Sequence, residues 1–151
     1  MSTRLLNALA LAGIAVATLV ILYITLTPEP PRWRSIVPSA ITAPEVVPTP
    51  SGWTDGGEEA LGHAALFFAL GVSASLWYAT SGAARRRPQR TLVATMLLLW
   101  LLGGITEALQ ALTPERQPQL SDLAFDVLGA FVGFLGGGLL WRLLLTRRPR
   151  R

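Results

Sequence analysis

The sequence predicts an all-α integral membrane protein with four transmembrane helices, and both its hydropathy and its charge pattern support this fold class. Hydrophobic residues make up 51% of the 151 residues and are concentrated in long runs. A helix that crosses a hydrocarbon core of about 30 Å needs roughly 20 mostly apolar residues. Four segments meet this requirement, namely residues 5–26, 58–80, 91–112 and 121–145. We therefore expect a lipid bilayer to surround most of the chain.

The distribution of arginine predicts the orientation of these helices. The 13 basic residues are all arginines, and most of them lie at alternate ends of the apolar segments. Those that do so are Arg4, Arg85, Arg86, Arg87, Arg90, Arg142, Arg147, Arg148, Arg150 and Arg151. Short basic flanks stay in the cytoplasm by the positive-inside rule. Both termini and the loop 81–90 are therefore expected inside, and the connections 27–57 and 113–120 outside.

The first apolar segment resembles a secretory signal peptide in one respect, because Arg4 precedes an apolar run. A signal peptide has an apolar core of roughly 7 to 15 residues. The run 5–26 is longer than this. An uncleaved anchor is therefore favoured, and we expect residues 1–26 to form the first transmembrane helix.

The segment after this helix is rich in proline. Residues 27–57 contain seven of the 11 prolines. Each proline fixes φ and lacks a backbone N–H, so we expect an extended external loop here. Residues 58–146 then form the membrane domain with the other three helices, and residues 147–151 a basic cytoplasmic tail.

The composition excludes two classes of site. The net charge of +4 is not spread over one helix face, as a nucleic-acid surface would require, so no nucleic-acid partner is expected. Cysteine is absent, which excludes disulfides and cysteine-ligated zinc.

Polar side chains recur near the predicted external ends of the last three helices. An ionisable side chain at the bilayer centre costs about 2.5–3.5 kcal/mol on insertion scales, so such residues tend to face the bundle interior and mark function. Because the three helices alternate in direction, the candidates are expected to converge, with Arg116 above them in the short loop. The candidates are Glu59, His63, Glu107, Gln110, Arg116, Asp122 and Asp126.

The cluster has two interpretations, a ligand-binding or catalytic site and a structural hydrogen-bond network that joins the helices. Helical spacing supports convergence, since Asp122 and Asp126 are four residues apart and share a face. Asp122 also has a structural explanation, because an acid in the first helical turn is stabilised by the helix dipole.

The last apolar segment contains a ladder of small residues. Gly129, Gly133 and Gly137 are spaced by four residues, a pattern that lets another helix approach closely in lipid. Packing within the bundle explains the ladder without a partner, and a dimer is the alternative, so the oligomeric state stays open.

Several of these residues lie in motifs that resemble the VanZ-like family of membrane proteins. The motifs are Glu59-x-x-x-His63, Gly104-Ile105-x-Glu107-x-x-Gln110, Pro114-x-Arg116, Asp122 and Gly129-Ala130-x-x-Gly133. They lie within residues 55–137 and follow the family's order and spacing. The departures are Glu59 for an Asp, Ala60 for a Lys, Ala64 for a Phe and Asp126 for an Asn.

The resemblance implies a role at the cell envelope, in the plasma membrane of a bacterium, because the founding member is associated with resistance to the glycopeptide teicoplanin. It carries the seven candidates over as the family's polar site without assigning them catalytic roles. The first hypothesis is therefore binding of an envelope lipid, a lipid-linked precursor or a glycopeptide antibiotic at the outer face.

Two other functions stay open. One is a membrane-embedded hydrolase or transferase for a lipid-linked phosphate or acyl substrate, with His63 as general base, Glu59 orienting it and Arg116 holding an anionic group. Carboxylates in such a site are candidate ligands for Mg²⁺ or Mn²⁺. The other is a proton-coupled carrier, although the acids all lie near one face of the membrane.

Overall fold

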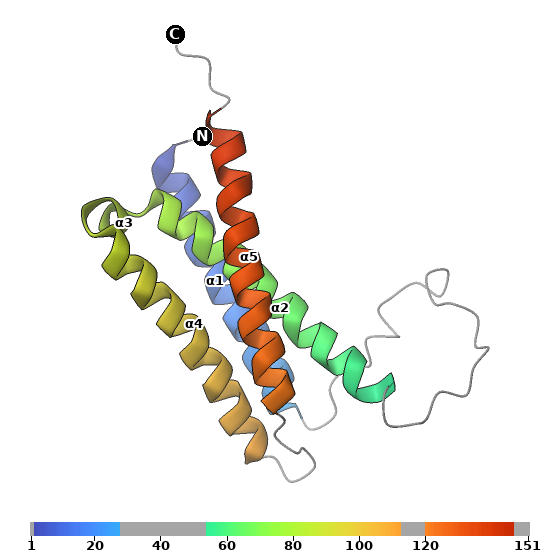
Figure 1. Cartoon of the computed structure of the whole chain (residues 1–151). Helices are drawn as coiled ribbons and strands as arrows, with labels where there is room; N and C mark the ends of the chain where they lie inside the picture. The colour runs from blue at the N-terminus through green and yellow to red at the C-terminus, as the bar shows by residue number, and fades with distance from the viewer. Residues whose placement is uncertain (1, 28–53, 113–119, 147–151) are drawn as a thin grey trace, which may run out of the picture.

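The structure is a computed structural model, and it describes residues 2–27, 54–112 and 120–146. These ranges contain five α-helices and no strand (Figure 1). The helices are α1 (Thr3–Leu26), α2 (Thr54–Thr80), α3 (Gly82–Arg86), α4 (Pro88–Ala111) and α5 (Leu120–Thr146).

Four of these helices are long and apolar enough to cross a membrane. The candidate spans are Thr3–Leu26, Leu61–Thr80, Pro88–Ala111 and Ser121–Leu144. Large apolar side chains cover their outer surfaces; Leu98 and Trp100 of α4, for example, are 65% and 57% exposed. Together with the length of these helices, this exposed apolar surface indicates a lipid environment. The predicted all-helical fold, with four helices that are candidate membrane spans, is thereby confirmed for the described residues.

Helix boundaries differ from the prediction by a few residues, most clearly at α2 and in the loop that precedes α4. Helix α2 begins at Thr54, four residues before the predicted segment 58–80. The loop 81–90 contains the short helix α3, which the hydropathy pattern did not predict. Ser81 caps it, since its Oγ accepts a hydrogen bond of 3.1 Å from the backbone N–H of Ala84. Pro88, in the first turn of α4, starts the next helix, a position where its missing N–H costs nothing.

Three predicted segments fall outside the described residues, wholly or in large part. These are the proline-rich loop, of which residues 28–53 are not described, the connection 113–119 and the tail 147–151. Their predicted structures stay predictions.

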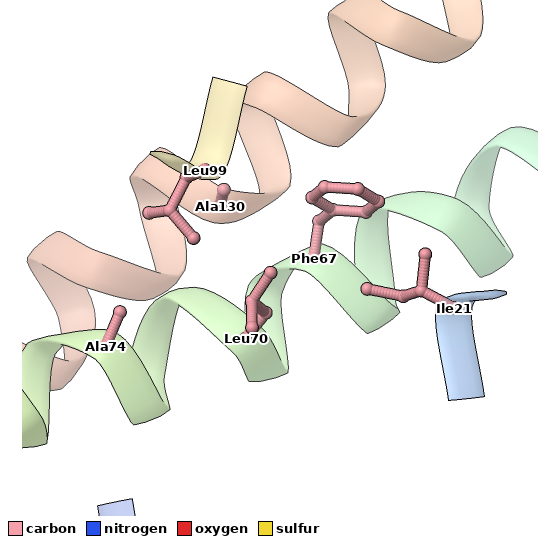
Figure 2. Close-up of a cluster of buried hydrophobic side chains, with 6 residues drawn as sticks. All are labelled: Ile21, Phe67, Leu70, Ala74, Leu99 and Ala130. Atoms are coloured by element: carbon pink, nitrogen blue, oxygen red, sulfur yellow. The ribbon is translucent and has the colours of Figure 1, made fainter. Parts of the chain in front are cut away.

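Helix α2 is the centre of the bundle, because it packs against both α1 and α5. Phe67, Leu70 and Ala74 recur at intervals of three and four residues, which places them on one face of α2. They form a buried core with residues from the other three long helices (Figure 2). The core residues are Ile21, Phe67, Leu70, Ala74, Leu99 and Ala130.

The glycine ladder lies at the contact between α5 and α2. Gly129, Gly133 and Gly137 all face α2. A Cβ atom at Gly133 would overlap the backbone carbonyl of Phe68, and Gly71 of α2 meets the backbone of α5 in the same way. Since apolar area gives little net drive for association in lipid, this close backbone contact is a main source of stability for the pair.

The long helices alternate in direction, which sorts charge to the two ends of the bundle. Thr80, at the end of α2, donates a hydrogen bond of 3.3 Å to Asn7, near the start of α1. The N-terminus, α3 and the end of α5 therefore lie together (Figure 1). We call this the arginine end, and the opposite end the acidic end, because of Glu107, Asp122 and Asp126. The described arginines of the arginine end are Arg4, Arg85, Arg86, Arg87, Arg90 and Arg142.

Candidate polar site at the acidic end

Each helix brings its polar residues to the site on the same face that it uses for packing. On α2, His63 precedes the core residue Phe67 by four positions. On α5, Asp126 precedes Ala130 by four positions, and on α4, Gln110 follows Thr106 by four. Residues four apart share a helix face. The packing that forms the core therefore also aims these side chains at one another.

The centre of the site is a chain of three buried side chains from three helices. His63 Nδ1 donates a hydrogen bond to Asp126 Oδ1 over 3.2 Å. The Gln110 amide Nε2 donates to His63 Nε2 over 3.5 Å. The exposed fractions are 6% for His63, 3% for Gln110 and 1% for Asp126. A neutral imidazole with its proton on Nδ1 satisfies both contacts. We call these three residues the polar site.

A glycine lets α4 reach the site. A Cβ atom at Gly103 would lie 3.2 Å from Leu123 Cδ1 and 3.6 Å from Asp126 Cβ. Glycine at this position therefore keeps α4 close to α5 beside the carboxylate. Gly104, which the family resemblance includes, has open space around its Cα.

Asp122 and Glu107 lie near the polar site. Asp122 is buried one turn before Asp126 and accepts a hydrogen bond of 3.5 Å from Ser121 Oγ. Glu107 is half-buried on α4, three residues before Gln110. The side chain of Glu59 and the whole of Arg116 fall outside the described residues. Their place in the site stays a prediction.

Two buried threonines at this end were not among the candidates. Thr106 is 1% exposed, and its Oγ1 donates a hydrogen bond of 2.7 Å to the Gly103 carbonyl. Thr25 of α1 is also 1% exposed, and its Oγ1 has no hydrogen-bond partner within the described residues. Gly13 of α1 lies beside Ser73 of α2, and the two helices are antiparallel. Thr25, further along α1, therefore lies level with the turn of α2 that contains His63.

The chemistry of this arrangement follows from the hydrogen bonds. Asp126 holds the imidazole through Nδ1 and so fixes both its tautomer and the direction of Nε2. The sequence analysis predicted that Glu59 would orient His63, whereas in the structure Asp126 makes the hydrogen bond to its Nδ1. In the described ranges, no group of three or more His, Cys, Asp or Glu side chains lies close enough to hold a metal ion.

Fold and site together define a multi-pass helical membrane protein with a histidine–carboxylate–amide cluster buried at one end of its bundle. The model of the VanZ/LLP1 family matches residues 14–144, and the chain belongs to this family. The match confirms the resemblance found within residues 55–137 and extends it into α1. No curated protein and no solved structure matches the chain significantly.

Proposed function

We propose that this VanZ-family membrane protein acts at the bacterial cell envelope by binding an envelope lipid, a lipid-linked precursor or a glycopeptide antibiotic at the polar site. Binding would contribute to envelope homeostasis or to glycopeptide resistance, with teicoplanin as the reference drug. The observation that carries the proposal is the buried chain from Gln110 through His63 to Asp126. Ionisable groups inside membrane spans are costly and commonly mark function.

The proposal includes an orientation in the plasma membrane, with the acidic end outside and both termini in the cytoplasm. The grouping of arginines supports it, because every described arginine lies at the arginine end. By the positive-inside rule this end faces the cytoplasm. The proline-rich segment 27–57 and the connection 113–120 then lie outside, on the side of the membrane nearer to the polar site.

The proposed ligand-binding surface extends beyond the polar site. Glu107 and Asp122 lie beside it on α4 and α5, and Glu59 lies one turn before His63 on α2. Arg116, in the connection between α4 and α5, supplies the cation that an anionic ligand requires. The buried Thr25 hydroxyl is a further hydrogen-bonding group at this level of the bundle.

The test is complementation of a strain that lacks the gene. Wild-type protein, His63→Ala and Gln110→Leu are expressed to equal membrane levels, and teicoplanin susceptibility and envelope lipid composition are measured. We expect the wild type to restore both properties and the two variants to fail. The matched control is Ser73→Ala, since Ser73 is a polar residue of the same helix whose hydroxyl bonds to the Ala69 carbonyl of α2 itself. Unchanged susceptibility and lipid composition in the deletion strain would refute the proposal.

One observation favours a second candidate function, a membrane-embedded hydrolase or transferase. A carboxylate that holds Nδ1 of a histidine orients Nε2 as a general base in several unrelated hydrolases. Here Asp126 holds Nδ1 of His63. In this role His63 takes a proton from the attacking group while Arg116 holds the anionic part of a lipid-linked phosphate or acyl substrate.

Turnover distinguishes the two candidates. Full-chain protein in lipid nanodiscs is incubated with lipid-linked phosphate and acyl substrates, and product is measured by mass spectrometry. The enzymatic candidate expects turnover by the wild type and by Ser73→Ala, and none by His63→Ala. Full turnover by His63→Ala would refute the role of His63 as general base, and binding without any turnover favours the first candidate.

A further inference from the structure

A large cavity opens at the arginine end, on the opposite side of the core from the polar site. It has a volume of about 710 Å³ and is lined by residues of α1, α2, α3 and α4. Helix α4 makes far fewer contacts with α1 and α2 than these two helices make with each other. The cavity therefore fills the space where α4 diverges from the bundle.

The walls of the cavity and its mouth differ in chemistry. Ile14, Leu70 and Leu99, from three different helices, give it apolar walls. Its mouth carries Arg86, Arg87 and Arg90, which are all exposed. The cavity thus combines an apolar interior with three cationic groups at one end.

These three guanidinium groups have no acidic neighbours in the surrounding sequence. The chain has no Asp or Glu between Glu59 and Glu107, a stretch that includes most of α2, all of α3 and most of α4. In the part of the chain that the structure describes, the acidic side chains of α4 and α5 lie at the opposite end. The charge at the mouth is therefore available to an anionic ligand.

We propose that this cavity binds one anionic phospholipid from the surrounding leaflet. An acyl chain occupies the apolar interior, and the headgroup phosphate contacts Arg86, Arg87 and Arg90. Guanidinium groups bind phosphate through paired hydrogen bonds, and basic pockets between transmembrane helices are recognised sites for anionic headgroups. The volume lies within the roughly 300–1,000 Å³ range of specific ligand pockets. The site shares no residue with the polar site and does not depend on the function proposed there.

A lipid fits these features better than a free anion or a protein segment. A free phosphate would use the arginines and leave the apolar interior empty. Leu98 lines the cavity and is also 65% exposed on α4, so the cavity wall continues into the lipid-facing surface of the helix. An acyl chain already in the bilayer can therefore enter without crossing water.

Native mass spectrometry of the full-length protein tests the proposal. Delipidated protein in a neutral detergent is titrated with phosphatidylglycerol or with phosphatidylcholine of identical acyl chains. We expect one phosphatidylglycerol molecule to bind more tightly than phosphatidylcholine. Replacing Arg86, Arg87 and Arg90 by Gln should weaken phosphatidylglycerol binding by about 5-fold per arginine. Ala94→Phe, which narrows the apolar interior and keeps the arginines, should weaken binding as well.

The matched control is the double variant Arg4→Gln, Arg142→Gln. Both residues lie at the arginine end, and neither lines this cavity. Phosphatidylglycerol binding should stay at the wild-type level in this variant. Equal affinity for the two lipids would overturn the proposal, as would an equal loss in the control and the triple variant. Full competition by glycerol phosphate, which has no acyl chain, would show a phosphate site and would also overturn it.

Discussion

Asp126 of α5 holds His63 of α2 through a hydrogen bond of 3.2 Å between Oδ1 and Nδ1, and both side chains are buried where the two helices pack. The contact joins residues 63 positions apart in the chain. It links the functional candidate to the fold, because the same helix pair supplies the glycine contacts that hold the bundle together.

The tautomer of His63 can be measured directly, because the sequence contains a single histidine. We expect ¹⁵N spectra of histidine-labelled protein to show a protonated Nδ1 and an unprotonated Nε2, since Nδ1 donates to Asp126 and Nε2 accepts from Gln110. Asp126→Ala should abolish the preference for this tautomer, and Ser73→Ala should leave it unchanged. A wild-type spectrum with the proton on Nε2 would contradict the hydrogen-bond assignment.

Stability should separate two replacements of Asp126. Asparagine keeps an oxygen that can accept from His63 Nδ1, so Asp126→Asn should unfold like the wild type. Asp126→Ala leaves the buried N–H without an acceptor and should lower the free energy of unfolding by about 1–3 kcal/mol. Unfolding in mixed micelles with increasing dodecyl sulfate measures the difference. Equal stability of the two variants would show that the hydrogen bond contributes little.

The glycine contact between α2 and α5 predicts a position-specific effect within one helix. A Cβ atom at Gly133 would overlap the Phe68 carbonyl, so Gly133→Ala should force the helices apart and cost about 1–3 kcal/mol. Gly136 has open space around it, which makes Gly136→Ala the matched control, with unchanged or slightly higher stability. The same unfolding assay applies to both. A Gly133→Ala variant as stable as Gly136→Ala would refute the close contact.

Thr25 offers a test of the hydroxyl that lacks a partner within the described residues. Valine has nearly the same shape, so Thr25→Val removes the cost of an unsatisfied buried group and should raise the free energy of unfolding by about 1–3 kcal/mol. The control is Thr27→Val, because the Thr27 hydroxyl donates to the Tyr23 carbonyl over 2.6 Å. This variant should gain nothing. Destabilisation by Thr25→Val would indicate a hydrogen bond that the native protein makes in its membrane.

The number and location of the spans could be predicted from the sequence, because the length of an apolar run decides whether it crosses a bilayer. Because consecutive spans alternate in direction, the sequence also predicted that His63, Gln110 and Asp126 would lie at one end. The structure brings these three side chains into contact. Their function stays a prediction. The capping of α3 by Ser81 is a local signal that hydropathy does not include.

Other features depend on the rotation and tilt of each helix, which the apolar pattern does not specify. A helix in lipid is apolar on its outer face as well as in its core, so periodicity does not identify the buried face. For this reason the sequence does not reveal that Gly103 makes the close contact with α5 while the neighbouring Gly104 does not. The cavity behind Arg86 was missed for the same reason, because it arises from the divergence of α4.

The contact between α2 and α5 also constrains how the protein is made. Helix α5 is the last of the described helices along the chain, and its glycines and Asp126 complete the surroundings of α2. Helices that insert one after another associate only once both are in the membrane. During synthesis His63 therefore lacks its carboxylate partner until α5 has entered the membrane. A polypeptide that stops before α5 leaves His63 without Asp126, and it leaves the face of α2 that packs against the α5 glycines uncovered.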